Sequence, residues 1–262
     1  MKLYEIVFSP TGGTKKVTDI LGESLAALGG LSDMERETVD LTDWEADFSA
    51  VSLSPEDIAL LAVPSYGGLV PKPALERLEK IRGNGARAVL VCVYGNRAFE
   101  DTLTELFDAA KRAGFQTAAA VAAIAEHSIA RAYACAAGRP DAQDEAQLKE
   151  YAGRIWEKLT GEECSAPSIP GNRPYKKRGV MEMIPMPADG CTSCGLCAEK
   201  CPVQAIDRSN PAQVDREKCI CCMRCIAVCP QAARALPQAA VDRVGGMLSS
   251  VSPSRRECEL FL

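Results

Sequence analysis

The chain has 262 residues, of which 47% are hydrophobic, so it can bury a substantial core, and its length favours two domains. Its formal net charge of −5 gives no reason to expect nucleic acid as a partner. Residues 1–8 contain no long apolar run, and no window approaches the roughly 18 apolar residues of a membrane span, so we expect no export or membrane segment. Thirteen cysteines without such a segment indicate a reducing compartment, and we expect the cytoplasm.

The first predicted strand leads into a loop rich in glycine and hydroxyl groups. Residues 2–9 (KLYEIVFS) form an apolar run that predicts a buried parallel strand, and apolar residues recur at helical spacing from Val17 to Leu28. Unpaired amides at a helix start favour an anion, and glycines let the backbone approach it closely. The loop lacks the Gly-Lys-Ser/Thr ending of a P-loop and is not a Rossmann fingerprint. It predicts either a phosphate site or an ordinary helix start, and the candidate phosphate ligands are Ser9, Thr11, Gly12, Gly13 and Thr14.

Four further strands are predicted, and loops with glycine and tyrosine follow two of them. The strands cover residues 37–41, 57–63, 86–93 and 115–125, and a closing helix covers residues 144–159. Five strands that alternate with helices predict an α/β fold with a doubly wound parallel sheet. Ligands of such sheets bind at the carboxyl ends of the strands. The candidate residues at two of these ends are Ser65, Tyr66, Gly67, Gly68, Tyr94, Gly95, Asn96 and Arg97.

The loop at residues 9–14 resembles the flavodoxin motif T/S-x-T-G-x-T, and the tyrosine loops resemble the two flavodoxin loops that sandwich a flavin ring. The resemblance implies a five-stranded flavodoxin-like sheet of order 2-1-3-4-5, with FMN as cofactor and its phosphate bound largely by neutral donors. It implies that Tyr66 stacks on the ring. Tyr94 either stacks on the ring or is the last core residue of its strand. In the second case Phe99 would stack in its place. Arg97 either stabilises an anionic reduced flavin or is solvated.

His127, the only histidine, lies just past the predicted fifth strand, in a long connection at residues 126–140. Because histidine titrates near neutrality, His127 could face the flavin and donate a proton to a reduced substrate. The alternative is a loop histidine that is hydrogen-bonded for structure. We expect Cys92 in the core, and we expect ordinary thiols at Cys135, Cys164 and Cys258.

Residues 161–187 are rich in proline and have no clear period, which predicts a linker. They contain the one basic cluster of the chain, Arg-Pro-Tyr-Lys-Lys-Arg at residues 173–178. The cluster is either part of a solvated linker or docks against an acidic surface, within the protein or on a partner carrier.

Eight cysteines form one spacing written twice, C-x2-C-x2-C-x3-C-P, with matching positions 28 residues apart. A disulfide framework, a zinc site and free thiols are the alternatives to an iron–sulfur site. Zinc ribbons pair two CxxC knuckles and need neither a third cysteine two residues on nor the closing Cys-Pro, so the spacing favours iron–sulfur clusters. Cys221 lies out of register beside Cys222 and is expected to be a thiol next to a cluster or in the core.

The repeat resembles a bacterial two-cluster [4Fe-4S] ferredoxin, a small α+β domain in which the fourth cysteine of each run ligates the other run's cluster. Position by position, the resemblance implies one cluster on Cys191, Cys194, Cys197 and Cys229. It implies a second cluster on Cys219, Cys222, Cys225 and Cys201.

Nearly the whole chain resembles a fusion family in which a flavodoxin-like domain precedes a two-cluster ferredoxin domain. We expect an FMN domain at residues 1–160, the linker at 161–187, the ferredoxin domain at 188–238 and a tail at 239–262 that begins with a short helix and packs back. The resemblance implies electron transfer between FMN, two [4Fe-4S] clusters and a redox partner protein or small reductant. The alternative is an FMN-dependent reductase of a small molecule.

Overall fold

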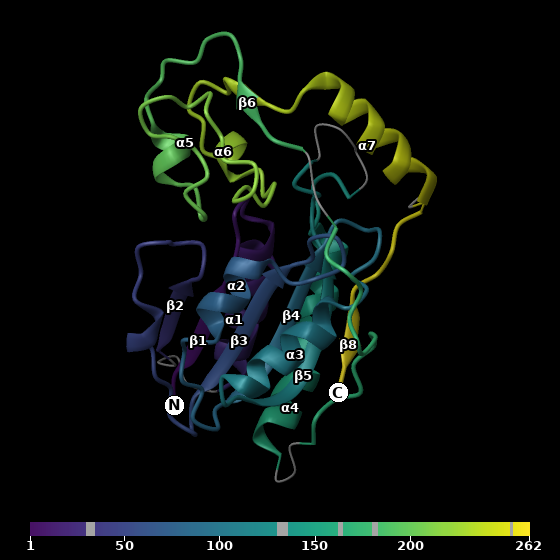
Figure 1. The fold of residues 1–262 in the computed structure, drawn as a ribbon. Helices are drawn as coiled ribbons and strands as arrows, with labels where there is room; N and C mark the ends of the chain where they lie inside the picture. Colours follow the sequence, from purple (N-terminus) through teal and green to yellow (C-terminus); the bar gives the residue numbers. More distant parts are fainter. Residues whose placement is uncertain (30–34, 130–135, 162–164, 180–182, 252–253) are drawn as a thin grey trace.

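The structure is a computed structural model that describes residues 1–29, 35–129, 136–161, 165–179, 183–251 and 254–262. Its centre is a six-stranded sheet of order β2-β1-β3-β4-β5-β8 (Figure 1). The strands are β1 (Leu3–Val7), β2 (Arg36–Asp40), β3 (Ile58–Pro64), β4 (Arg87–Tyr94), β5 (Gln116–Ile124) and β8 (Glu259–Phe261). Neighbours from β2 to β5 pair in parallel, and β8 adds an antiparallel edge next to β5. The predicted flavodoxin-like order is therefore confirmed, and the sheet gains a sixth strand beyond the five predicted.

Helices cover both faces of this sheet, which explains why the four strands β1, β3, β4 and β5 are almost entirely buried. The helices are α1 (Gly13–Leu28), α2 (Lys72–Leu78), α3 (Thr102–Arg112) and α4 (Ala142–Thr160). Leu21 of α1 and Ile155 of α4 belong to one buried cluster, and Leu78 of α2 and Leu103 of α3 belong to the other. In the described residues, no helix combines the length and the apolar character that a bilayer crossing requires. With both faces covered, the loops at the strand ends are left to bind ligands.

The cysteine runs form a second, smaller unit, which lies beyond the carboxyl ends of the parallel strands (upper left in Figure 1). It consists of a two-stranded sheet of β6 (Met186–Pro187) and β7 (Arg234–Ala235) and two short helices, α5 (Leu196–Glu199) and α6 (Arg224–Ala227). Each helix follows a residue in the left-handed region, Gly195 with φ 78° and Met223 with φ 63°. These two residues are 28 positions apart, so the repeat in the sequence is also a repeat of the backbone.

Hydrogen bonds join the cysteine-rich unit to loops of the larger domain. Arg224 Nη1 of α6 donates to the carbonyl oxygen of Pro10 at 3.2 Å, which ties α6 to the glycine loop before α1. Trp44 Nε1 donates to the carbonyl oxygen of Glu199 at 3.0 Å. The unit is thereby held over the strand ends where a ligand of the sheet would bind.

Residues 172–178 of the expected linker dock on α3. Asp101 accepts hydrogen bonds from the backbone amides of Asn172 and Lys176, each at 2.8 Å. Arg173 pairs with Asp108 at 2.8 Å, and this hydrogen bond lowers the pKa of Asp108. Of the two alternatives for the basic cluster, these contacts support docking on an acidic surface within the protein, while its basic residues stay exposed to solvent.

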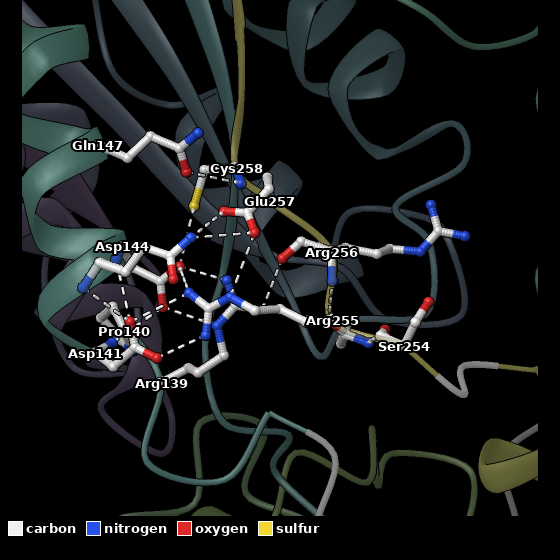
Figure 2. A network of polar contacts seen from close by, with 12 residues as sticks. Arg139, Pro140, Asp141, Asp144, Gln147, Ser254, Arg255, Arg256, Glu257 and Cys258 are labelled. Atoms are coloured by element: carbon white, nitrogen blue, oxygen red, sulfur yellow. Dashed lines mark hydrogen bonds and ion pairs between the residues drawn. The ribbon is translucent and has the colours of Figure 1, made fainter.

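The tail beyond the cysteine-rich unit returns to the sheet. Helix α7 (Gln238–Val251) confirms the helix expected from residue 239, and the chain then runs along the domain to β8. Figure 2 shows the polar network that attaches this C-terminal segment to α4. Asp144 of α4 accepts from Arg139 Nε at 2.8 Å and from Arg255 Nη2 at 3.0 Å. The side chains of Arg139 and Asp144 are 5% and 0% exposed, so this pair lies in the interior.

Of the cysteines expected to be ordinary thiols, Cys258 is buried beside this network, and burial raises its pKa to about 11. Cys92 is buried in the core as predicted. Cys135 and Cys164 lie outside the described residues.

Candidate functional site

A cavity of about 350 Å³ lies at the end of the sheet where the carboxyl ends of its parallel strands meet, and we call it the edge cavity. Its volume falls within the range of about 300–1,000 Å³ of ligand pockets. Loops after β1, β3, β4 and β5 line it, together with α7 and one thiol of the cysteine-rich unit. Twelve of the predicted residues are brought together in its wall: Ser9, Thr11, Gly13, Thr14, Ser65, Tyr66, Gly67, Gly68, Tyr94, Gly95, Arg97 and His127. Gly12 and Asn96 are not part of this wall.

The loop after β1 offers hydrogen-bond donors at one end of the edge cavity. Gly12 caps α1 with φ 92°, a left-handed conformation in which an alanine would be strained. The Ser9 hydroxyl accepts from the Lys15 amide at 2.9 Å, so its own proton remains available to a ligand. Thr14 lines the cavity, and its hydroxyl has no hydrogen-bond partner among the described residues. Neutral hydroxyls and amides at a helix start are suited to an anion.

The two lysines next to this loop direct their charges elsewhere. Lys15 Nζ pairs with Asp19 and lies 3.5 Å from Glu5. Lys16 Nζ donates to the carbonyl oxygen of Pro140 at 2.8 Å. The donors at this end are therefore largely neutral, which fits the phosphate monoester of FMN.

The two predicted tyrosines occupy different environments. Tyr66 is half-buried in the cavity wall, and burial, with the nearby Cys222 and Cys221, raises its pKa well above the ordinary value. Tyr94 is 4% exposed and ends β4 in the core, where its ring meets Phe99 edge to face at 5.4 Å. Tyr94 still contributes to the wall, whereas Phe99 does not. The geometry therefore leaves Tyr66 as the better placed of the two for stacking.

Asn96 and Arg97 have partners that the sequence did not indicate. Asn96 Oδ1 accepts from the Arg256 backbone amide at 2.9 Å, and Asn96 Nδ2 donates to the carbonyl oxygen of Ser254 at 2.8 Å. Its side chain thus holds the returning tail. Arg97 lines the cavity and pairs with Glu100, so its guanidinium is neither fully solvated nor free of a counter-charge.

His127 packs directly on the loop after β4. A Cβ atom at Gly95 would come within 2.2 Å of His127 Cδ2, so the glycine is required for this approach. His127 Nδ1 accepts from the Ile129 amide at 3.1 Å, which places its proton on Nε2 in the neutral ring. Burial, and to a lesser extent the charge of Arg97, lower the pKa of His127. His127 is thus neutral near pH 7, which suits a hydrogen-bond donor better than a general acid.

Helix α7 supplies a wall that the sequence did not assign to the site. Val244, Met247, Leu248 and Val251 line the edge cavity. They follow helical spacing, which was the available signal, but nothing in that spacing indicates which surface the helix covers. Val244 and Leu248 pack with Cys221 in one buried cluster, so α7 joins the cavity to the cysteine-rich unit.

A second cavity of about 700 Å³ adjoins the edge cavity. The two share Thr11, Gly13 and residues 126–129, so His127 lines both. Cys229 and the apolar side chain of Val241 also line the second cavity. It provides room for a further molecule beside the glycine loop.

The eight repeated cysteines gather around two separate cavities. One is lined by Cys201, Cys219, Cys222 and Cys225, which we call the inner thiol set. The other is lined by Cys191, Cys194, Cys197 and Cys229, which we call the outer thiol set. Each set combines three cysteines of one run with the fourth of the other, as the crossed ligation requires. Four thiols around one cavity are the donor set that a [4Fe-4S] cluster needs.

The two sets differ in their exposure. Cys201 and Cys222 of the inner set are buried, whereas Cys191 and Cys194 of the outer set are exposed. Cys221 is buried and lines both the inner cavity and the edge cavity. The thiol that breaks the repeat therefore separates the inner set from the candidate flavin site.

Comparison with known families identifies the cysteine-rich unit. Residues 183–230 match the family model described as 4Fe-4S dicluster domain. The chain is 44% identical over 45 residues to a component of the ion-translocating oxidoreductase complex of Methanosarcina acetivorans, covering 17% of each chain. It is 37% identical over 65 residues to a ferredoxin of Pyrobaculum islandicum, covering 22% of this chain and 61% of the other. The chain thus spans less than two thirds of the length of both relatives.

Comparison with solved structures finds flavodoxins along the larger domain. The Streptococcus pneumoniae TIGR4 flavodoxin is 22% identical with a TM-score of 0.41 and covers 60% of this chain and 97% of its own. Flavodoxin 1 from Bacillus cereus is 14% identical with a TM-score of 0.43 and covers 61% of this chain and 100% of its own. The sheet order described above carries the fold assignment independently: a flavodoxin-like α/β domain is followed by a 4Fe-4S dicluster domain.

Proposed function

We propose that this protein is an iron–sulfur flavoprotein that transfers electrons between FMN in the edge cavity, two [4Fe-4S] clusters on the inner and outer thiol sets, and an external redox partner. The 4Fe-4S dicluster match and the flavodoxin-like fold support an electron-transfer role. A bound flavin exchanges one or two electrons while each cluster exchanges one, so together they couple two-electron to one-electron chemistry.

The position of Cys221 is the observation that carries this proposal. Its side chain lines the edge cavity on one side and the cavity of the inner thiol set on the other. Tyr66, on the loop after β3, lies close enough to Cys221 and Cys222 for their charges to act on its pKa. The candidate flavin site and the inner set are therefore neighbours, which favours the inner cluster as the flavin's direct redox partner.

The outer thiol set is the candidate contact with the external partner. Cys191 and Cys194 are exposed, so a cluster held there lies at the protein surface. An electron carrier that docks at residues 191–195 would reach this cluster without displacing any part of the larger domain.

The remaining residues of the site bind FMN and shield it from water. Hydroxyls of Ser9, Thr11 and Thr14 and the first amides of α1 hold the phosphate. The Tyr66 ring covers one face of the flavin, and α7 excludes water from the cavity through Met247 and Leu248. No side chain needs to act as an acid or base for electron transfer between bound cofactors.

Cofactor analysis of anaerobically reconstituted protein tests the proposal. We expect about eight irons and one FMN per chain, with flavin absorption bands above the broad iron–sulfur absorption. Clusters reduced by dithionite should be reoxidised when FMN is present. Eight irons without bound flavin would remove the relay and leave a tethered ferredoxin.

Thr14→Val should weaken FMN binding by about tenfold to a hundredfold, because one hydrogen bond to a charged group contributes about 1.5–3 kcal/mol. Valine keeps the branched shape of this buried side chain and removes only the hydroxyl. The measurement is the FMN dissociation constant of the apoprotein from quenching of flavin fluorescence.

Two controls accompany this measurement. Riboflavin, which lacks the phosphate, should bind wild type and Thr14→Val equally. Thr18→Val, one turn further along α1, removes a hydroxyl that donates to the Thr14 carbonyl oxygen at 2.9 Å and should leave FMN binding unchanged. Equal FMN affinity of Thr14→Val and wild type would show that the phosphate lies elsewhere.

A second candidate function is the reduction of a small molecule by FMN, and the second cavity is the observation that favours it. His127 lines both cavities and presents an Nε2 proton that could donate a hydrogen bond to a substrate. This function predicts that His127→Ala lowers substrate turnover by about 10²–10³-fold, the effect of removing one hydrogen-bond donor to the developing charge, while the rate of cluster reduction is unchanged. Equal turnover would exclude His127 from the chemistry.

A further inference from the structure

A buried arginine lies between the two thiol sets. Arg234, the first residue of β7, is 2% exposed. It is the one residue found in the walls of both the inner and the outer cavity, among the part of the chain that the structure describes. Any cluster held by either set therefore has this guanidinium as a neighbour.

Most of the donors of Arg234 lack protein acceptors. Nη1 donates to the carbonyl oxygen of Pro211 at 2.9 Å and lies 3.6 Å from Cys197 Sγ. Nε and Nη2 are buried and have no partner, and no carboxylate pairs with the guanidinium in the described ranges. A buried cation without a counter-charge is costly, so unpaired donors of this kind point to a missing anionic acceptor.

The thiol sets supply that acceptor chemistry. Cluster-bound cysteines are thiolates, and four of them give each cluster a negative charge that falls on the sulfur atoms. Cys197 of the outer set is within reach of Nη1. On the inner side, Arg234 lines the same cavity as Cys219 and Cys225, so the guanidinium also borders the inner set.

The internal repeat shows that the arginine is an addition to a shared framework. In the first half the Ala205 amide donates to Cys201 Sγ at 3.3 Å, and in the second half the Ala233 amide donates to Cys229 Sγ at 3.3 Å. The next residue is Ile206 in one half and Arg234 in the other, 28 positions apart. Ile206 is 7% exposed and packs in an apolar cluster. The same backbone position thus carries an apolar side chain in one half and a charge in the other.

We propose that Arg234 directs its unpaired N–H groups toward the sulfur atoms of both clusters and raises the reduction potential of each. A cluster gains one negative charge on reduction, so a fixed positive charge and sulfur hydrogen bonds stabilise the reduced form more than the oxidised form. The inference rests on the proposed function only in requiring that both clusters are bound. Arg234 acts as a positioning and tuning residue and takes no electron itself.

An EPR-monitored redox titration of the reconstituted full chain tests this role, with Arg234→Ile as the variant because it copies the residue of the other half. Arg234→Ile should retain about eight irons per chain. At the same applied solution potential, the ratio of reduced to oxidised cluster in this variant should be about tenfold or more lower than in wild type. For a one-electron couple this is a shift of about 59 mV toward negative potential.

Three further proteins make the result specific. Arg234→Lys keeps a point charge without the fork of donors and should recover part of the wild-type potential. Ile206→Leu changes the matched apolar residue and should titrate as wild type. Arg234→Gln, which keeps a polar side chain with an NH₂ donor but removes the charge, should also shift the potentials to negative values, and this variant provides the test if Arg234→Ile binds less iron.

Unchanged potentials in a neutral variant that holds both clusters would overturn the inference. Wild-type protein that binds fewer than two clusters would instead overturn the proposed function, so the two failures are distinguishable by the iron content alone.

Discussion

Alanine at both Cys201 and Cys222 is expected to remove one [4Fe-4S] cluster completely and to leave the other intact. The two cysteines belong to different runs of the sequence, but both line the cavity of the inner thiol set. Removing two of its four thiols abolishes that cluster, while the outer set keeps all four of its ligands. Iron analysis should give about four irons per chain, and spin quantification after reduction should give one cluster.

The matched double variant is Cys194→Ala with Cys201→Ala. These cysteines belong to the same run but to different cavities, so each cluster loses one ligand and no intact [4Fe-4S] cluster should remain. If each run instead held its own cluster, the two double variants would exchange results. The pair therefore separates crossed from uncrossed ligation without reference to any partner or substrate.

Asp144→Ala is expected to lower the free energy of unfolding of the larger domain by about 3–5 kcal/mol, because it leaves a buried charge unpaired. Arg139 is 5% exposed and donates to Asp144 from both Nε and Nη2, and Arg255 of the returning tail donates to the same carboxylate. The substitution also removes half of the capping box that begins α4. Urea unfolding of the reconstituted full chain, followed by far-UV circular dichroism, measures the effect.

The neighbouring residue in the same turn of α4 provides the control. Glu145 forms an exposed pair with Lys149, and such pairs contribute about 0.3–0.5 kcal/mol, so Glu145→Ala should be nearly neutral. Similar losses for the two variants would show that the network of Figure 2 contributes no more than surface charge. Protease susceptibility of residues 254–258 should rise in Asp144→Ala alone, because Arg255 then loses its buried acceptor.

The parts of this molecule that were predictable from sequence carry their information locally. Strands β1, β3, β4 and β5 are short apolar runs, and the loop at residues 9–14 joins glycine to hydroxyl groups within six positions. The cysteine repeat is visible in its spacing, and the grouping of its thiols was implied by the resemblance to two-cluster ferredoxins. In each case the signal lies within a few residues, where periodicity and composition can reveal it.

The parts that were not predictable depend on contacts between distant segments. The basic cluster at 173–178 meets Asp101 and Asp108, about seventy positions earlier, and neither acidic residue belongs to a motif. Strand β8 has only three residues, so no alternation can mark it, and it pairs because β5 exposes an edge. Arg234 becomes informative only when its burial is known, since an arginine after a Cys-Pro run is ordinary in sequence.

Because β8 pairs antiparallel with β5, the chain returns to the larger domain after the cysteine-rich unit. This unit is therefore inserted into the larger domain and not attached to it at one end only. Docking of residues 172–178 on α3 fixes the chain that enters this unit, and β8 fixes the chain that leaves it (Figure 1). A domain on a single flexible linker samples many orientations, and its reactions then depend on solvent viscosity and on the time spent near its partner. Anchorage at both ends, together with the hydrogen bonds that Arg224 and Trp44 form between the unit and the larger domain, restricts that search.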